Sequence, residues 1–176
     1  SGNNAFMEIF HLDCGRKYFS VDQIEGIIDT LADNDYTHME LAVGNDGLRF
    51  LLDDMSVTAN DTTYTSDAVK AGIQAGNEAY YNDPNGNALT QTEMDTIISY
   101  ANENGIGIIP LINTPGHMDA ILYAAESLTG NNNLDYSGSV TTIDVTNAEA
   151  VAFTKALLDK YITYFSGKSC TYFNMG

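Results

Sequence analysis

One segment constrains the fold of this chain more than any other. Residues 106–112 read Ile-Gly-Ile-Ile-Pro-Leu-Ile, a run with no polar side chain on either face. A strand that is apolar on both faces is typical of a parallel sheet covered by helices on its two sides. Residues 5–13, 38–43 and 169–173 are three further predicted strands, so we expect about four parallel strands along the chain.

Helices are predicted between these strands from their start signals and their periodicity. Ser20 with Gln23, and Thr90 with Glu93, form capping boxes, in which a Ser or Thr is followed three residues later by Gln or Glu. Asn147 is predicted to cap the last helix. The expected helices cover residues 20–34, 66–81, 90–104, 118–128 and 147–165, and residues 53–65 are expected to form a solvated polar loop.

Strands that alternate with helices indicate an α/β fold with parallel strands and helical crossovers. Eight such units close a barrel, and this chain has about four. The predicted fold class is therefore α/β, the first half of a (β/α)8 TIM barrel, with residues 1–176 forming part of one domain that is truncated after the fourth strand. Its outer strands would be open edges. We expect either a truncated chain or self-association of two copies through these open sheet edges.

The composition excludes several classes of partner. Seven Lys and Arg oppose 24 Asp and Glu, and the formal net charge of −17 is unlike the basic surface that nucleic acid requires. No stretch approaches the roughly 20 apolar residues of a membrane span. Cys14 and Cys170 lack metal or redox spacing, and the acidic pairs at 53–54 and 60–61 lack the spacing of a calcium loop. We expect no nucleic acid partner, no membrane span, no metal, no cofactor and two free thiols.

The unusual polar residues gather in the turns after the first three predicted strands. These turns are residues 13–16 (Asp-Cys-Gly-Arg), 44–49 (Gly-Asn-Asp-Gly-Leu-Arg) and 113–117 (Asn-Thr-Pro-Gly-His). The carboxyl ends of parallel strands meet at one edge of the sheet, where α/β enzymes place their chemistry. We therefore expect the three turns to lie on one rim.

Three side chains in these turns are candidates for chemistry, and each also has a structural interpretation. Arg16 carries a planar fork that grips adjacent hydroxyls or a carboxylate, although an ion pair with Asp13 would also account for it. His117 can orient or tune a neighbouring carboxylate, or it can be a buried histidine with its hydrogen bonds satisfied. Asp46 stands in an Asn-Asp-Gly sequence, which forms turns wherever it occurs.

Four segments together resemble a known enzyme family. They are residues 11–19 (HLDCGRKYF), 45–50 (NDGLRF), 109–117 (IPLINTPGH) and 173–176 (FNMG). In this order, at these strand ends, they are similar to the signatures of glycoside hydrolase family 20, the β-N-acetylhexosaminidases. The resemblance is greatest to the branch of bacterial cell-surface exo-β-N-acetylglucosaminidases and lacto-N-biosidases, and it extends from Ala5 to Gly176.

The resemblance implies a retaining glycosidase that removes terminal β-linked N-acetylhexosamine from glycans. In this family the acetamido oxygen of the substrate attacks the anomeric carbon to form an oxazolinium ion. A Glu acts as general acid and then as base, and the Asp before it stabilises the acetamido nitrogen. That Asp-Glu pair is expected after one further residue beyond Gly176, so we expect the 176-residue chain alone to be inactive.

The resemblance also assigns supporting roles to residues of this chain. Arg16 matches the arginine that binds the outer hydroxyls of the terminal sugar, and His117 matches the histidine behind the acid Glu. Asp46, Asn45 and Asn113 are expected to be substrate-binding. The family often has Asp-Asp at the second turn and Asp at the third, so we expect a carboxylate relay onto His117 to be altered or absent here.

Several alternatives stay open from the sequence. The chain is either part of an enzyme or a non-catalytic carbohydrate-binding or assembly module built on a half barrel, and an unrelated barrel enzyme that uses Arg16 for an anionic substrate is a third interpretation. The terminal sugar is N-acetylglucosamine, N-acetylgalactosamine or a disaccharide such as lacto-N-biose. The resemblance implies an extracellular or bacterial cell-surface location.

Overall fold

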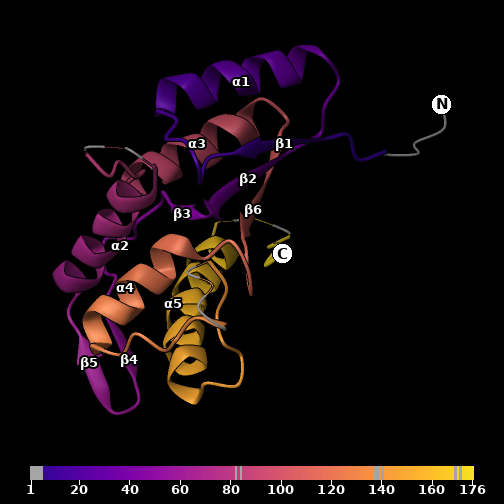
Figure 1. The fold of residues 1–176 in the computed structure, drawn as a ribbon. Coiled ribbons are helices and arrows are strands. Elements are labelled where there is room, and N and C mark those ends of the chain that lie inside the picture. Colours follow the sequence, from indigo (N-terminus) through magenta and orange to yellow (C-terminus); the bar gives the residue numbers. More distant parts are fainter. Residues whose placement is uncertain are drawn as a thin grey trace.

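The computed structural model describes residues 6–81, 83, 85–136, 139, 141–168, 170 and 172–176. Its central sheet contains β1 (Ile9–Asp13), β2 (His38–Asn45) and β6 (Gly107–Ile112), which are parallel and lie in the order β1-β2-β6 (Figure 1). A two-residue strand, β3 (Gly47–Leu48), turns back and pairs antiparallel with the end of β2. The predicted α/β class is confirmed, and neighbouring parallel strands in chain order are consistent with part of a β/α barrel.

The strand predictions differ from the structure at their ends. β1 begins at Ile9 rather than at residue 5, which lies outside the described residues. β2 continues through Gly44 and Asn45, because those residues pair with β3 instead of leaving the sheet. The third strand begins at Gly107, one residue later than predicted.

The predicted fourth strand is wrong in its extent. Ser169 and Thr171 lie outside the described residues, and the others of 169–173 are in no strand. Contact with β6 comes one residue later, at Asn174, which forms an isolated parallel bridge with Leu111. Its backbone accepts from Ile112 N at 3.0 Å and donates to the Pro110 carbonyl at 2.9 Å. The segment therefore lies next to β6, as a fourth parallel strand would.

The five predicted helices are confirmed with small shifts at their ends. They are α1 (Val21–Asp33), α2 (Ser66–Tyr81), α3 (Gln91–Glu103), α4 (Asp119–Thr129) and α5 (Ala148–Ser166). Both capping boxes are present, at Ser20 with Gln23 and at Thr90 with Glu93, and the Asn147 side chain accepts from the first turn of α5. Figure 1 shows α1 packed beside α3 and α2 packed beside α4.

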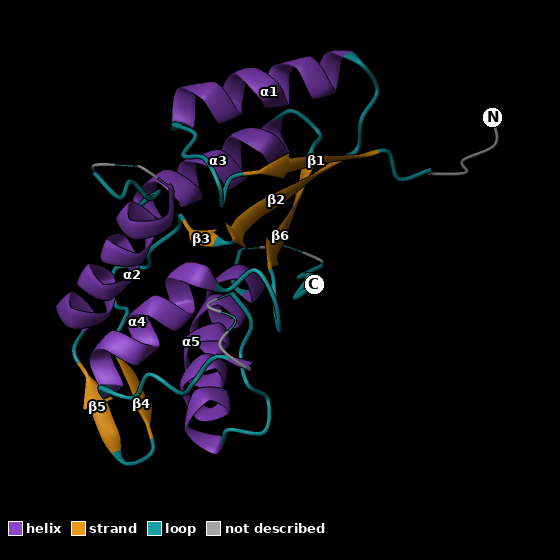
Figure 2. Ribbon diagram, viewed as in Figure 1, coloured by secondary structure: helices purple, strands orange, loops and turns teal. Residues whose placement is uncertain are grey.

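The expectation of a solvated loop over residues 53–65 is wrong. β4 (Val57–Ala59) and β5 (Thr62–Tyr64) form a short antiparallel hairpin there, at the end of the molecule farthest from α1 (Figure 2). Asn60 and Asp61 form its turn with φ of 53° and 61°, the left-handed values that a two-residue hairpin turn requires. Val57 and Ala59 are buried, so apolar packing rather than hydration determines the conformation of this segment.

The two faces of β2 differ in what they contact. Met39, Leu41 and Val43 alternate along one face and are buried in the hydrophobic core. Glu40, on the other face, hydrogen-bonds to side chains of β1 and of the segment beside β6. The helices therefore cover one face of the parallel strands, while polar groups occur on the opposite, inner face.

Two glycines let α2 and α4 approach closely. A Cβ atom at Gly76 would lie 2.9 Å from Cα of Ala120, and one at Gly72 would lie 3.2 Å from Cβ of Ala124. Both distances are tighter than ordinary contact, so this pair of helices tolerates little added volume on α2. Within the described residues, no helix combines the length and the apolar character needed to cross a bilayer.

Candidate active site

The turns after β1, β2 and β6 meet at one rim, as expected from the sequence. The backbones of the first two turns touch: a Cβ at Gly15 would lie 2.4 Å from the backbone nitrogen and oxygen of Asn45, and one at Gly47 would lie 2.4 Å from the carbonyl oxygen of Gly15. No side chain fits at either position. The two glycines therefore allow the turns to come together.

Asp46 is the central residue of this rim. One carboxylate oxygen accepts from Nε of Arg16, and the other lies 2.7 Å from Nδ1 of His117. The carboxylate side chain is only 11% exposed, whereas Arg16 is 55% exposed and His117 is 56% exposed. A buried carboxylate thus holds two polar side chains that face solvent. Arg16 lies farther from Asp13, at 3.9 Å, so Asp46 is its main carboxylate partner.

Backbone conformation and backbone hydrogen bonds also hold Asp46 and His117 in place. Asp46 and His117 both have left-handed φ values, 63° and 54°, which are uncommon for residues other than glycine. Asp46 N donates to the His117 carbonyl at 2.7 Å, and Ala120 N at the start of α4 donates to the Asp46 carbonyl at 2.9 Å. These two backbone bonds therefore hold the second turn against the third turn and the first turn of α4, and they stabilise the two strained residues.

The contact to Asp46 also determines which nitrogen of His117 carries the proton. An ionised carboxylate only accepts hydrogen bonds, so Nδ1 donates to Asp46. In the neutral ring only one nitrogen carries a proton, so Nε2 is unprotonated and can accept a hydrogen bond. The expectation that a carboxylate relay onto His117 would be altered or absent is corrected in part: Asp46 supplies the carboxylate, while Asn113 donates from Nδ2 to Asn45.

Asn45 and Asn113 form a second chain of contacts beside this one. Asp13 accepts from the backbone nitrogens of Gly15 and Arg16 and, at 2.8 Å, from Nδ2 of Asn45. Oδ1 of Asn45 in turn accepts from Nδ2 of Asn113 at 2.8 Å. Because the Asp13 carboxylate only accepts, the orientations of the Asn45 and Asn113 amides in this series of hydrogen bonds are fixed.

Arg49 is a structural residue that the sequence analysis did not single out. Its guanidinium is buried, donates from Nε to the Gly15 carbonyl at 2.8 Å, and donates from Nη1 to Asp83 at 2.7 Å and to the Asn87 carbonyl at 2.8 Å. It therefore ties the turn after β1 to the segment before α3. A single cation inside the apolar run of residues 48–52 was the available signal, since a charge in such a run requires a buried partner.

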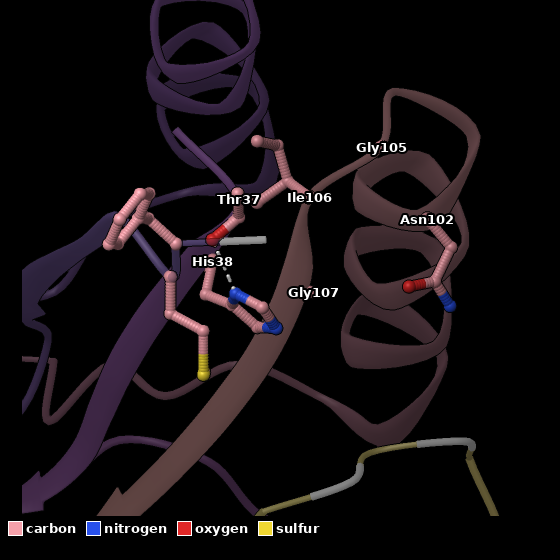
Figure 3. Close-up of a pocket in the computed structure, with 8 residues that line it drawn as sticks. Thr37, His38, Asn102, Gly105, Ile106 and Gly107 are labelled. Atoms are coloured by element: carbon pink, nitrogen blue, oxygen red, sulfur yellow. Dashed lines mark hydrogen bonds between the residues drawn. The ribbon is translucent and has the colours of Figure 1, made fainter. Parts of the chain in front are cut away.

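One hollow lies at the opposite end of the strands from the rim, and another lies beside the third turn. A cavity of about 380 Å³ opens at the amino ends of β2 and β6, and Figure 3 shows His38 there with its ring near Gly107. Nδ1 of His38 lies 2.7 Å from the Thr37 hydroxyl, and a Cβ at Gly107 would lie 2.7 Å from the ring. A larger, mainly apolar hollow of about 530 Å³ runs along α5. Neither hollow is lined by Arg16, Asp46 or His117.

The remaining titratable residues add no competing site in the part of the chain that the structure describes. No cluster of three or more His, Cys, Asp or Glu residues there could hold a metal ion. Burial raises the pKa of the Cys14 thiol to about 12 and that of Cys170 to about 11, so both are poor nucleophiles at neutral pH. Both cysteines are free, as predicted.

Comparison with known proteins identifies relatives of this chain. Residues 9–176 match the family model described as glycosyl hydrolase family 20, catalytic domain. The chain is 49% identical to the solved structure of the pneumococcal exo-β-D-N-acetylglucosaminidase StrH, with a TM-score of 0.93, and the match covers 98% of this chain and 42% of that one. The chain thus spans less than half the length of this relative.

Two further relatives extend the comparison. A lacto-N-biosidase of Bifidobacterium bifidum is 36% identical over 89 residues, which cover 49% of this chain and 8% of that protein. A solved β-hexosaminidase of Streptomyces plicatus is 20% identical with a TM-score of 0.72, covering 96% of this chain and 32% of that one. At such low identity the second comparison supports the fold alone.

Proposed function

The chain belongs to glycosyl hydrolase family 20, and we propose that it forms the first half, about four β/α units, of a (β/α)8 catalytic barrel. The whole enzyme would be a retaining glycosidase that hydrolyses terminal β-linked N-acetylhexosamine from glycans. The acetamido group of the substrate would act as the nucleophile and form an oxazolinium ion. No metal or cofactor takes part in this chemistry.

The observation that carries this proposal is the line of contacts from Arg16 through Asp46 to His117 at the carboxyl ends of the strands. A glycosidase must bind a neutral sugar that is rich in hydroxyl groups, and it must deliver a proton to the leaving oxygen. A solvent-facing guanidinium with a fixed orientation suits the first task, because its planar fork donates to adjacent hydroxyls. A solvent-facing imidazole held by a buried carboxylate suits the second.

Each rim residue then has a role in the proposed reaction. Arg16 would bind the outer hydroxyls of the terminal sugar, and His117 would support the Glu that protonates the leaving oxygen and later activates water. Asp46 would orient both side chains. Direct sugar contacts by Asp46, Asn45 and Asn113 stay predictions, and the amides of Asn45 and Asn113 would present atoms whose orientation Asp13 fixes.

The terminal sugar that we propose is N-acetylglucosamine. The supporting fact is the 49% identity over nearly all of this chain with a protein described as an exo-β-D-N-acetylglucosaminidase. The lacto-N-biosidase comparison covers only half of the chain, so lacto-N-biose is the second candidate. An extracellular or cell-surface location stays a prediction from the resemblance.

We further propose that the 176-residue chain is inactive by itself. Its sequence contains no Asp-Glu dipeptide, and the rim residues that it supplies are a cation, an imidazole and a carboxylate already engaged with both. Release of nitrophenol from 4-nitrophenyl N-acetyl-β-glucosaminide by the purified chain, above the rate of an Arg16→Ala control, would contradict this proposal.

The proposed activity is tested with the whole protein that carries the chain. We expect it to release nitrophenol from 4-nitrophenyl N-acetyl-β-glucosaminide and not from 4-nitrophenyl β-glucoside, which lacks the acetamido nucleophile. N-acetylglucosamine thiazoline should inhibit it. Equal hydrolysis of both substrates would exclude substrate assistance, and binding of N-acetylglucosamine without any hydrolysis would favour the non-catalytic module.

A further inference from the structure

A second line of polar contacts crosses the inner face of the sheet, below the rim. Nδ1 of His11 on β1 lies 2.8 Å from Oε1 of Glu40 on β2, and Nδ2 of Asn174 donates to Oε2 of Glu40 at 3.1 Å. Glu40 is thus held from both sides by residues on neighbouring segments. None of the three belongs to the rim described above: His11 and Glu40 lie within β1 and β2, before the turns that follow these strands, and Asn174 lies beside β6.

The chemistry of Glu40 fixes the direction of every bond in this line. An ionised carboxylate only accepts, so His11 donates from Nδ1, and Asn174 must present its NH2 group rather than its oxygen. Oδ1 of Asn174 consequently points the other way, where it accepts from the backbone nitrogen of Gly176 at 2.9 Å. Glu40 therefore determines which end of the Asn174 amide meets the backbone.

The backbone of Met175 and Gly176 also has contacts with the turn after β6. The Met175 carbonyl accepts from the backbone nitrogen and from the hydroxyl of Thr114, both at 3.1 Å. Gly176 has a φ of 85°, and a Cβ there would lie 2.8 Å from Oδ1 of Asn113. Met175 and Gly176 are thus held between the turn after β6 and the side chain of Asn174.

We propose that Glu40 is a positioning residue for the catalytic carboxylates of the whole enzyme, acting through Asn174. The inference rests on the proposed function and on the expectation from the family resemblance that the Asp-Glu pair comes after one further residue beyond Gly176. Glu40 touches neither that pair nor the substrate. It sets the orientation of the Asn174 amide, the amide sets the Gly176 backbone, and this backbone sets the direction in which the next residues leave the strand.

The size of the expected effect follows from the geometry that catalysis requires. A displacement of about 1 Å at the reacting groups can cost on the order of 100-fold in rate. Hydrogen-bond partners that orient the ligands of a metal site commonly change affinity or activity by about 10-fold to 100-fold, and we expect a positioning residue here to act on the same scale. Substrate binding through Arg16 involves different contacts, so the loss is expected in kcat rather than in KM.

The first test is Glu40→Gln in the whole protein, with 4-nitrophenyl N-acetyl-β-glucosaminide as substrate. An amide at position 40 has one accepting oxygen and one donating NH2 group. Its NH2 group therefore faces either Asn174, whose own amide must then turn, or His11, whose Nδ1 accepts only in the other tautomer of the ring. We expect kcat to fall by about 10-fold to 100-fold while KM changes by less than about 2-fold. Glu103→Gln, the same substitution at an exposed position on α3, is the matched control and should leave both constants unchanged.

The second test exchanges the two functional groups. Asn174→Asp alone would place two carboxylates at the 3.1 Å contact and should also lower kcat. In the double variant Glu40→Gln, Asn174→Asp, the amide at position 40 can accept from His11 and donate to position 174. The carboxylate there can then accept from Gly176. We expect the double variant to recover kcat to within about 5-fold of the unaltered protein.

A third variant separates positioning from folding. Asn174→Ala leaves the His11–Glu40 pair in place and should reproduce the loss of kcat with an unchanged melting temperature. The inference is overturned if Glu40→Gln has the kcat of the Glu103→Gln control, or if the double variant is no more active than its parents. An unaltered protein without hydrolase activity would overturn the proposed function and this inference together, whereas full activity of Glu40→Gln would overturn the inference alone.

Discussion

Arg16 and Arg49 are each paired with an aspartate, but the two arginines differ in how far their side chains are exposed to solvent. Arg49 is 2% exposed, and its partner Asp83 is 15% exposed. Arg16 has a similarly buried partner, Asp46, but is itself more than half exposed. The buried pair joins segments of the fold, while the exposed pair holds a cation toward solvent. The comparison shows that the same kind of ion pair can bury a cation inside the fold or present it to solvent, and we propose a ligand contact only for the exposed cation, Arg16.

Arg49→Met is expected to have the largest effect, because it removes the cation from a buried pair. Asp83 and the carbonyls of Gly15 and Asn87 would lose their donor in a site with little access to water. We expect the free energy of unfolding to fall by about 3–5 kcal/mol, measured by urea denaturation with circular dichroism. Arg16→Met should cost less than about 1 kcal/mol. If Arg49→Met and Arg16→Met lowered the free energy of unfolding equally, burial would not distinguish the two ion pairs.

Arg16→Ala is expected to reverse the ranking when activity is measured instead of stability. Hydrogen bonds to charged groups are worth about 1.5–3 kcal/mol, so losing the guanidinium should lower kcat/KM of the whole enzyme by about 10-fold to 100-fold. Arg16→Lys should restore only part of this, because a point charge does not reproduce the planar fork. An Arg16→Ala enzyme with unchanged kcat/KM would show that the exposed pair has no role in substrate binding.

The variant Asp83→Asn tests whether the charge of the buried pair makes the stability of the fold depend on pH. Burial alone would raise the pKa of Asp83, but hydrogen bonds from the backbone of Asn85, from Arg49 and from the backbone of Asn87, with the charge of Arg49, lower it overall. A carboxyl with a lowered pKa stabilises the fold above its unfolded value near 4, and this stabilisation is lost as pH falls through the folded pKa.

We therefore expect Asp83→Asn to lower the free energy of unfolding by about 1–2 kcal/mol at pH 7, and the difference from the unaltered chain to shrink below about pH 4. Urea denaturation at pH 7, 5 and 3 measures this. A difference that is constant across the three pH values would mean that the Asp83 charge contributes nothing.

Glu126 gives the smallest expected effect, with the opposite sign. Burial, then a hydrogen bond with Asp135 and its negative charge, raise the pKa of Glu126 from 4.5 to about 7. Its contribution to stability is present below about pH 4.5 and is lost as pH rises through 7. Glu126→Gln should therefore stabilise the chain at pH 8 by less than about 1 kcal/mol, since the side chain is partly solvated, and should give no gain at pH 4.

Local signals explain what the sequence predicted well. The capping boxes at Ser20 and Thr90 and the Asn147 cap involve residues within three positions of each other, so pattern alone identifies them. The three polar turns came together as expected because the ends of parallel strands must meet at one edge. The limits of β2 were missed because Gly44 and Asn45 stay in the sheet only by pairing with β3.

Contacts between distant residues explain what the sequence did not predict. Asp46 and His117 are 71 positions apart, and their contact depends on two left-handed backbones. The β4–β5 hairpin was taken for a polar loop because each strand has only three residues, and its burial against α5 is a tertiary effect. The buried role of Arg49 was missed because its partners lie 34 to 38 positions away, in the turn after β1 and in the segment before α3.

The close approach of α2 to α4 has a consequence for how this protein can vary. Ala120 packs against Gly76 and also donates its backbone nitrogen to Asp46, so the first turn of α4 links that glycine to the rim. Adding a methyl group at Gly76 would push on the segment that follows His117. Natural variation and laboratory mutagenesis should therefore find Gly76 nearly as intolerant of change as the rim itself, although it lies on a helix that need never meet a sugar.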